Sequence, residues 1–182
     1  WFSPEFRNER VPTLDQVFEE IKGAVPMDIE IKSPRNGGRV SELAGRVVDC
    51  IERHGMTERV FVTSFNPLIL AAIRERAPDI PRGQLVGTFA ESELGGFSKL
   101  VLQRLSLNKQ ADVDIIVGEA AFLTEDRIRR YRELGYRVMA WTVNEEPEMR
   151  RLLSLGVLGI ITDDPRLARQ VVRSASEGAT PD

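Results

Sequence analysis

Three charged residues in the segment MDIEIK, at residues 27–32, could bind a metal ion or an anion. Side chains alternate between the two faces of a β-strand, so Asp28, Glu30 and Lys32 share one face and the apolar residues share the other. Two interpretations stay open: a structural ion-pair layer, or a hard-cation ligand (Glu30) beside a cation that binds an anionic substrate group (Lys32). The second suits phosphate chemistry, and because one carboxylate holds a divalent ion poorly, it needs further ligands from elsewhere.

The chain has one histidine and one cysteine, and we expect both to be structural. His54 precedes Gly55 at the end of a helical pattern, which predicts a helix C-terminus away from the C-terminal ends of the strands. Cys50 lies within the same pattern, and we expect it in the core with no histidine to activate it. The sequence therefore predicts no acid–base histidine and no Ser-His-Asp site.

Two aromatic residues lie where strands are expected to end, Phe65 in TSFNP and Trp141 in AWTVN. They either form an aromatic wall for a small ligand or pack in the core. Asp163 and Asp164 precede a proline, which is typical of a helix start, so we interpret them as helix caps rather than ligands.

The elements that must position these residues alternate regularly along the chain. Runs rich in valine and isoleucine predict six strands, at residues 27–32, 59–65, 84–89, 114–119, 137–143 and 159–162. The segments between them carry apolar residues at i, i+3, i+4 and i+7, which predicts helices, and capping residues, prolines and glycines mark the helix ends. This alternation predicts an α/β fold with a parallel sheet covered by helices.

Two architectures have this pattern, the doubly wound open sheet and the (β/α)8 TIM barrel. No Gly-rich phosphate loop of the dinucleotide or Walker type follows any predicted strand, and polar residues recur near the C-terminal strand ends. We prefer the barrel, in which Asp28, Glu30 and Lys32 would point into the mouth. A whole barrel takes about 250 residues, so this chain would cover about six of the eight strand–helix units.

We expect a partial barrel domain over residues 1–173 and a flexible polar tail over residues 174–182. The net charge of −3 and the pI near 5.4 argue against a nucleic-acid partner. No window reaches the roughly 18 consecutive apolar residues of a transmembrane segment. The single cysteine marks no oxidising compartment, and the cellular location stays open, with the cytoplasm as the default.

Several segments together resemble the glycerophosphodiester phosphodiesterase family: VPTLDQVFEEIKG, DIEIKSP, RVFVTSFNP and GYRVMAWTVNEEPEMRRLLSLGVLGIITDDP. The resemblance runs from residue 1 to about residue 167. It implies a TIM-barrel enzyme of lipid and glycerol metabolism that hydrolyses small-molecule glycerophosphodiesters to an alcohol and glycerol 3-phosphate with Ca²⁺ or Mg²⁺. It further implies that Glu30 is a metal ligand, that Lys32 contacts the phosphate, and that Phe65 and Trp141 line the glycerol pocket.

The sequence also departs from the family pattern. The His-Arg-Gly, Glu-Asn-Thr and Glu-x-Asp motifs of the family and its second histidine are missing, and with them the remaining metal ligands and the proton-transfer groups. The first hypothesis is therefore the C-terminal portion of such a hydrolase, inactive by itself. The second is a truncated, non-catalytic barrel that acts as a binding or assembly module and covers its open sheet edges, for example by pairing with a second copy.

Overall fold

The computed structural model describes residues 3–32, 39–88 and 111–177 of the chain. Its sheet contains six strands in the order β1-β2-β3-β4-β5-β6, and every neighbouring pair is parallel. Spatial order therefore follows chain order, and β1 and β6 form the edges of the described sheet. The strands are Met27–Glu30 (β1), Val60–Ser64 (β2), Arg82–Val86 (β3), Ile115–Glu119 (β4), Arg137–Trp141 (β5) and Gly159–Ile160 (β6).

Helices follow most of the strands in the described residues, and several of their N-termini carry the expected caps. Thr13 and Gln16 form a reciprocal capping box at the start of α1, and Asn66 caps α3 ahead of a proline. The helices are α1 (Leu14–Ile21), α2 (Val40–Arg53), α3 (Pro67–Arg76), α6 (Glu125–Glu133), α7 (Glu146–Ser154) and α8 (Pro165–Glu177), with short 3₁₀ helices η1 (Pro4–Phe6), η2 (Thr57–Arg59) and η3 (Ala120–Phe122).

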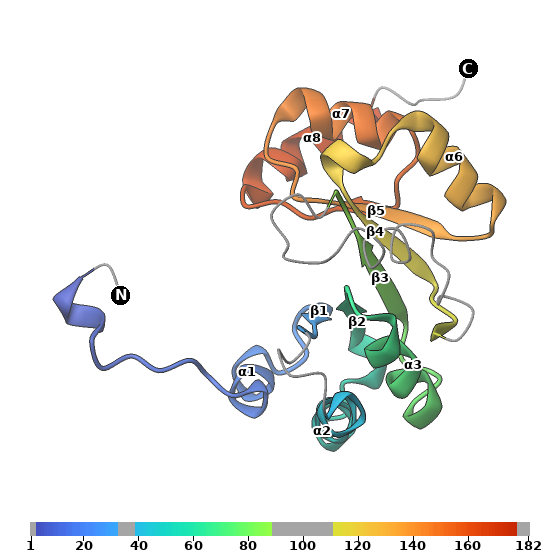
Figure 1. Ribbon diagram of the computed structural model, residues 1–182. Helices are drawn as coiled ribbons and strands as arrows, with labels where there is room; N and C mark the ends of the chain where they lie inside the picture. The colour runs from blue at the N-terminus through green and yellow to red at the C-terminus, as the bar shows by residue number, and fades with distance from the viewer. Residues whose placement is uncertain (1–2, 33–38, 89–110, 178–182) are drawn as a thin grey trace.

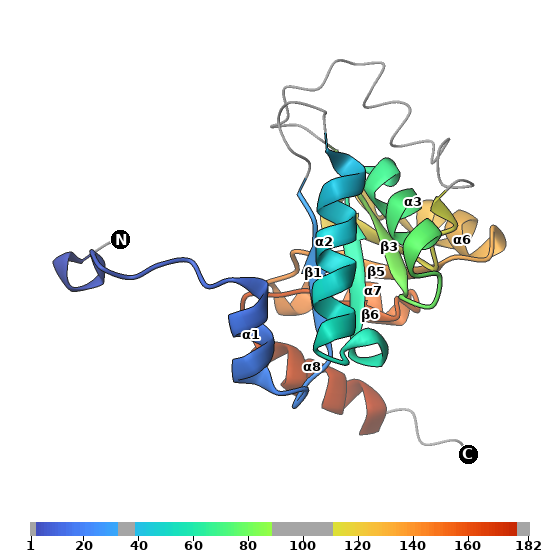
Figure 2. The same ribbon diagram turned by 90° about the horizontal axis from the view of Figure 1, so that it is seen from below.

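The sheet curls into a half-barrel with the helices on its outer side. Figure 1 shows α2 and α3 beside the first strands and α6, α7 and α8 beside the last ones, with the strands curving between the two groups. Figure 2 shows the N-terminal segment before α1 leading away from the body of the molecule, as expected for a loop. The prediction of a parallel α/β barrel architecture is confirmed over the part of the chain that the structure describes.

The two faces of the sheet have separate apolar clusters. The larger cluster lies between the sheet and the helices and includes Val62, Ile116 and Val138. A smaller cluster on the inner face consists of buried Leu85, Ile115 and Val117 with partly buried side chains packed against them: Phe61, Phe65, Met139, Trp141 and Ile161. The inner face of the curl is thus a packed interior rather than an open pore, as in a barrel.

All six predicted strands are present, but some boundaries differ. β3 begins at Arg82 rather than at residue 84, because the Arg82 side chain is buried and its guanidinium donates to surrounding backbone carbonyls. β3 ends at Val86, so residues 87 and 88 are not part of the strand as predicted, and residue 89 lies outside the described residues. α8 continues to Glu177, so the first four residues of the predicted tail are helical, and residues 178–182 lie outside the described residues.

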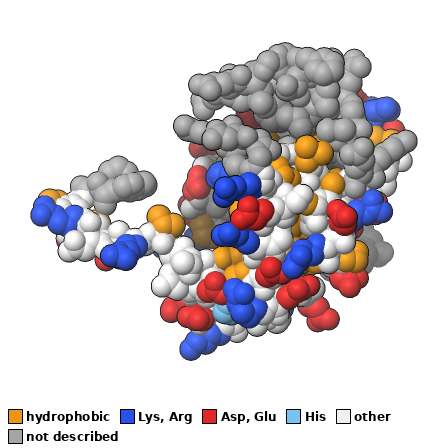
Figure 3. All heavy atoms as spheres, turned by 60° about the horizontal axis from the view of Figure 1, so that its bottom comes forward, with side chains coloured by type: hydrophobic (Ala, Val, Ile, Leu, Met, Phe, Trp, Pro, Cys, Tyr) orange, Lys and Arg blue, Asp and Glu red, His pale blue; other side chains and the backbone are white. Residues whose placement is uncertain are grey.

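The outer surface and the helix lengths relate to the predictions about nucleic-acid and membrane partners. Acidic and basic side chains are interspersed on the face shown in Figure 3 instead of forming one continuous basic stripe. None of the described helices is both long and apolar enough to cross a bilayer.

Candidate functional site

The alternation predicted for the segment MDIEIK is present in the structure. Met27, Ile29 and Ile31 pack into the helix-side core, so Asp28, Glu30 and Lys32 occupy the opposite, inner face. β1 pairs in parallel with β2, which aligns Glu30 with Thr63 near the C-terminal ends of both strands. The charged face therefore lies at the end of the sheet where barrel enzymes hold their active sites.

Glu30 and Lys32 form an ion pair at that end. The Lys32 Nζ atom donates to Glu30 Oε1 at 3.0 Å. The Lys32 side chain is 81% exposed and that of Glu30 is 36% exposed, so solvent or a ligand can reach both groups. An exposed pair of this kind adds about 0–1 kcal/mol to stability.

Asp28 belongs to the same face but is bonded differently. It accepts a hydrogen bond of 2.9 Å from the Thr63 hydroxyl. Although Asp28 is exposed at its surface, the surrounding protein atoms remove part of its hydration and raise the pKa of its carboxyl to about 6. The Thr63 hydrogen bond opposes this increase, and the negative charge of Glu30 adds to it.

Phe65 and Trp141 meet across the inner face, as a ligand wall requires. Their ring centroids are 5.6 Å apart and the ring planes are nearly perpendicular, at 82°. The Trp141 Nε1 donates to the Val117 carbonyl at 3.0 Å, which fixes the orientation of the indole. Both rings are only partly buried, so part of each remains accessible at the C-terminal end of the strands.

A further carboxylate, which the sequence analysis does not single out, lies at this end of the sheet. Glu119 ends β4 and is aligned with Trp141 in the next strand. Its Oε2 atom accepts from the Thr88 backbone N–H at 2.6 Å and from the Thr88 hydroxyl at 2.8 Å. A Cβ at Gly87 would lie 2.7 Å from that oxygen, so the absence of a side chain at Gly87 permits this contact.

The loops after β5 and β6 are joined by a polar network. The Asn144 amide donates to Asp163 at 2.8 Å, and its carbonyl oxygen accepts from the Thr162 hydroxyl at 3.1 Å and from the Asp163 backbone N–H at 2.9 Å. Asp164 accepts from the backbone N–H groups of the first turn of α8. Asp164 is therefore the expected helix cap, whereas Asp163 joins two loops.

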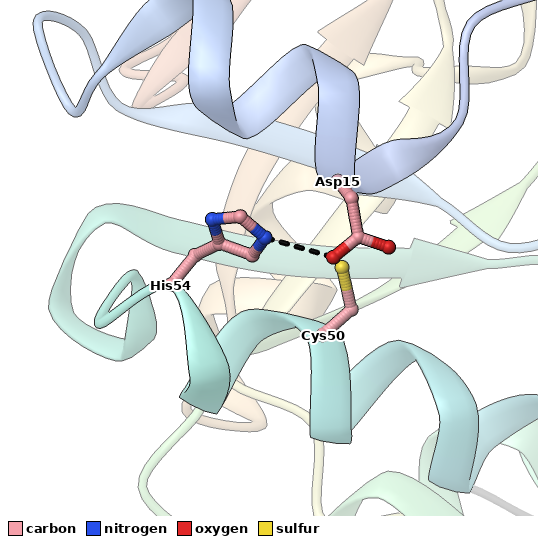
Figure 4. Close-up of side chains that lie close together, drawn as sticks. All are labelled: Asp15, Cys50 and His54. Atoms are coloured by element: carbon pink, nitrogen blue, oxygen red, sulfur yellow. Dashed lines mark hydrogen bonds and ion pairs between the residues drawn. The ribbon is translucent and has the colours of Figure 1, made fainter.

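Cys50 and His54 are brought together with Asp15 of α1, a contact that the sequence does not predict. Cys50 is buried as expected, at 5% exposure. His54 follows one turn later as the C-cap residue of α2. Their ligand atoms and a carboxylate oxygen of Asp15 lie within 4.8 Å of one another (Figure 4). The spacing of four residues in the sequence indicates that Cys50 and His54 lie close together. The approach of Asp15 depends on the packing of α1 against α2, which the sequence does not show.

The charges in this cluster favour an ionised carboxylate. Hydrogen bonds from Arg53 and His54 lower the pKa of Asp15 to about 2. Burial, together with the nearby charge of Asp15, raises the pKa of the Cys50 thiol. The cluster lies between two outer helices, whereas Glu30 lies on the inner face of the sheet, so the two places are distinct.

The residues at the strand ends fit a hard cation only in part. Glu30 offers an accessible carboxylate, and Lys32 beside it offers a positive charge for a phosphate oxygen. One group of three ligating side chains among the described residues is close enough to share an ion: Asp15, Cys50 and His54. Glu30 is not part of that group. An ion at Glu30 would therefore need further ligands beyond the acidic, histidine and cysteine side chains that the described residues gather around it.

Comparison with known proteins identifies the family of the chain. Residues 1–167 match the model of the glycerophosphoryl diester phosphodiesterase family. The chain is 29% identical over 175 residues to a glycerophosphodiester phosphodiesterase of Caldanaerobacter subterraneus, covering 94% of this chain and 66% of the relative. It is 24% identical over 174 residues to a glycerophosphodiester phosphodiesterase of Bacillus subtilis, covering 92% of this chain and 56% of the relative.

Solved structures agree on the fold. A glycerophosphodiester phosphodiesterase from Parabacteroides distasonis superposes with a TM-score of 0.73 at 21% identity, over 91% of this chain and 65% of that one. A phosphodiesterase from Oleispira antarctica, in complex with its product sn-glycerol-3-phosphate, superposes with a TM-score of 0.71 at 22% identity, over 93% of this chain and 64% of that one. The chain thus spans between 56% and 66% of the length of these relatives.

Proposed function

Because the chain belongs to the glycerophosphoryl diester phosphodiesterase family, we propose that its complete gene product hydrolyses glycerophosphodiesters to an alcohol and sn-glycerol 3-phosphate. We propose in addition that the reaction needs a divalent cation, Ca²⁺ or Mg²⁺. The 182 residues of this chain would supply one part of that active site and have no hydrolase activity alone. The product named for the Oleispira antarctica relative, sn-glycerol-3-phosphate, supports the choice of substrate class.

The observation that carries this proposal is the accessible Glu30–Lys32 pair at the C-terminal end of β1. In a parallel barrel that end is the catalytic face, and an acid next to an ammonium there can serve a cation and a phosphate together. We propose that Glu30 is a ligand of the cation and that Lys32 contacts a phosphate oxygen. When bound, the cation would stabilise negative charge on the phosphate and acidify a coordinated water molecule.

The aromatic pair gives the rest of the substrate a place to bind. Phe65 and Trp141 present partly exposed ring surface at the same end of the sheet, and we propose that they line the pocket for the glycerol moiety. The Val117 carbonyl holds the indole in position through Nε1, so the wall is preformed rather than assembled by the ligand.

The proposed inactivity of the isolated chain rests on its own residues. Its single histidine, His54, lies in the outer helix layer with its Nε2 atom 2.8 Å from Asp15, so it does not reach the inner face. Glu30 belongs to no group of three or more acidic, histidine or cysteine ligands among the described residues. The proton-transfer groups and the other ligands of the reaction would come from residues outside this chain.

The second candidate function is a non-catalytic binding or assembly module. It is favoured by the position of β1 and β6 at the edges of the described sheet, where strand backbone groups can pair with another chain. Such a module would form a complex or a homo-oligomer in the absence of substrate and cation.

One experiment separates the two functions. The product of the natural gene is isolated, its intact mass is measured, and its hydrolysis of glycerophosphocholine is assayed with Ca²⁺, with Mg²⁺ and with a chelator, next to the 182-residue chain. We expect cation-dependent hydrolysis by the gene product and none by the chain. Hydrolysis by the isolated chain would contradict its proposed inactivity, and no hydrolysis of any glycerophosphodiester by the gene product would support the assembly module.

A further inference from the structure

A carboxylate, a thiol and an imidazole converge between α1 and α2, away from the residues proposed for catalysis. Asp15 lies in the first turn of α1, Cys50 lies in the last turn of α2, and His54 is the C-cap residue of α2, one turn after Cys50. Their ligand atoms all lie within 4.8 Å of one another. Figure 4 shows the three side chains pointing toward a common point from the two helices.

We propose that Asp15, Cys50 and His54 form a binding site for one transition-metal ion of the zinc type. A sulfur, a nitrogen and an oxygen donor are the ligands that Zn²⁺ takes in tetrahedral sites, with a water molecule as the fourth ligand. Ca²⁺ and Mg²⁺ prefer oxygen ligands only, so this site would not take the cation proposed for catalysis.

The helices hold two of the donors in a geometry suited to chelation. Residues four positions apart on a helix lie on the same face, about 5–6 Å apart at Cβ, so the side chains of Cys50 and His54 can reach one ion together. The His54 ring packs against Phe18 of α1 at a centroid distance of 5.3 Å. Phe18 is buried, at 2% exposure, so this contact fixes α1 against the histidine.

The third donor comes from the other helix and already lies close. Asp15 Oδ1 is 2.8 Å from His54 Nε2, a hydrogen-bond distance. A bound ion would replace this hydrogen bond, with the two ligand atoms moving apart slightly to accept a metal between them. The capping box at Thr13 holds the start of α1, and with it the backbone of Asp15, in a defined place.

Arg53 is the main competitor for the site. Its Nη2 atom lies 2.6 Å from the same carboxylate oxygen of Asp15. The Arg53 side chain is 58% exposed, so its guanidinium can turn into solvent when an ion takes its place. Replacing Arg53 should therefore strengthen metal binding, which is the opposite of the effect expected for the three ligands.

The occupied site would fasten α1 to the rest of the molecule. Phe18 is the one buried residue of α1, so few apolar contacts hold this helix. An ion that binds the folded state and not the unfolded chain raises the folding stability by mass action. We therefore expect the melting temperature to rise with metal concentration.

The test uses Co²⁺ as a spectroscopic probe for Zn²⁺. Reduced protein treated with a chelator is titrated with Co²⁺, and the thiolate-to-cobalt charge-transfer absorption is recorded, followed by displacement with Zn²⁺. We expect one equivalent of Co²⁺ to give this absorption and Zn²⁺ to abolish it. Cys50→Ala should remove the absorption, and Asp15→Asn and His54→Gln should weaken binding by about tenfold or more.

Three further variants make the result specific. Glu52→Gln removes an exposed carboxylate from the same helix and should leave binding unchanged, whereas Arg53→Gln should tighten it. Glu30→Gln should leave the absorption intact, which separates this site from the proposed catalytic one. Absence of the charge-transfer absorption in the wild-type protein, or its persistence in Cys50→Ala or in both His54→Gln and Asp15→Asn, would overturn the proposal.

Discussion

The Lys32 ammonium lies 3.0 Å from the Glu30 carboxylate on the inner face of β1, at the C-terminal end of the parallel sheet. Both side chains remain accessible, so the pair contributes little to folding and is available to a ligand. In the proposed phosphodiesterase, the acid holds the cation and the lysine holds the phosphate.

Lys32→Ala should reduce turnover without loss of stability. If the ammonium stabilises charge on the phosphate, its removal from the complete gene product should lower kcat/KM for glycerophosphocholine by about two orders of magnitude or more. The free energy of unfolding should change by less than about 1 kcal/mol, because the ion pair is exposed. Steady-state kinetics and denaturant unfolding measure the two effects.

Arg173→Ala is the matched control, because it removes an exposed positive charge from α8. It should leave both quantities unchanged. A Lys32→Ala enzyme with the wild-type rate would leave Lys32 as a structural ion-pair partner.

Trp141→Ala should weaken substrate binding more than Trp141→Phe. The alanine variant loses the ring that meets Phe65, and we expect KM for glycerophosphodiesters to rise about tenfold, as for one lost aromatic contact. The phenylalanine variant keeps a ring but loses the hydrogen bond to the Val117 carbonyl, so its KM should rise less. Equal KM values in all three proteins would argue that the aromatic pair is core packing alone.

Asp28→Asn should change how the stability of the metal-free 182-residue chain depends on pH. The pKa of Asp28 is about 6 in the folded chain, above the ordinary value of 3.8, so the folded state binds this proton more tightly than the unfolded state. The free energy of unfolding should therefore fall as pH rises from about 4 to about 6, and the variant should not show this part of the fall.

The size of the effect follows from the exposure of Asp28. A fully buried carboxyl with this pKa would cost about 3 kcal/mol above pH 6, and because the side chain keeps contact with solvent we expect about 1 kcal/mol. Urea unfolding at pH 4 and at pH 7.5 measures it, with Asp79→Asn as the control for loss of one negative charge. An Asp28→Asn chain no more stable than wild type at pH 7.5 would contradict the raised pKa.

Gly87→Ala should destabilise the chain through Glu119. The new Cβ would lie 2.7 Å from Glu119 Oε2, so the carboxylate must leave its position and lose its two hydrogen bonds to Thr88. We expect a cost of about 1–2 kcal/mol. In a Glu119→Ala background the same glycine substitution should cost less, because the tightest contact that remains is the 3.2 Å contact with the Cβ of residue 119, which a double-mutant cycle tests.

Gly159→Ala is a matched control in β6, because its Cβ would make an ordinary contact of 3.4 Å with Met139. It should cost little. Equal costs of Gly87→Ala with and without Glu119 would show that the strain arises elsewhere.

Arg82→Met should be strongly destabilising although Arg82 makes no ion pair among the described residues. Its guanidinium is buried and donates to the backbone carbonyls of Pro78, Ile80, Ala111 and Asp112. Methionine fills the space but leaves these carbonyls without donors, at a cost of about 3 kcal/mol. Thermal unfolding measures this, and a change below about 1 kcal/mol would mean that water replaces the donors.

The sequence predicts the strands and the inner face of β1 because both depend on local periodicity. Met27, Ile29 and Ile31 mark the helix side, so the opposite side follows for Glu30 and Lys32. Contacts between distant elements do not follow from periodicity. The approach of Glu119 to Gly87 needs the β3–β4 pairing, and the meeting of Asp15 with Cys50 and His54 needs the packing of α1 on α2.

The sequence also does not predict a strand boundary at a position where a polar residue is buried. Arg82 lies between Pro81 and Gly83, and these three residue types together are typical of a turn. Arg82 nevertheless begins β3, because backbone carbonyls of the adjoining loops accept hydrogen bonds from its guanidinium. No local pattern reveals that these carbonyls will surround it.

The central claim, that Glu30 binds the catalytic cation, is tested most directly by assaying Glu30→Gln in the complete gene product. Release of sn-glycerol 3-phosphate from glycerophosphocholine is measured against the concentration of Ca²⁺ or Mg²⁺, together with the melting temperature. The account predicts that the wild-type protein is cation-dependent and that Glu30→Gln loses the activity or needs far more cation, with an unchanged melting temperature. A Glu30→Gln protein with the wild-type rate and the wild-type cation dependence would contradict it.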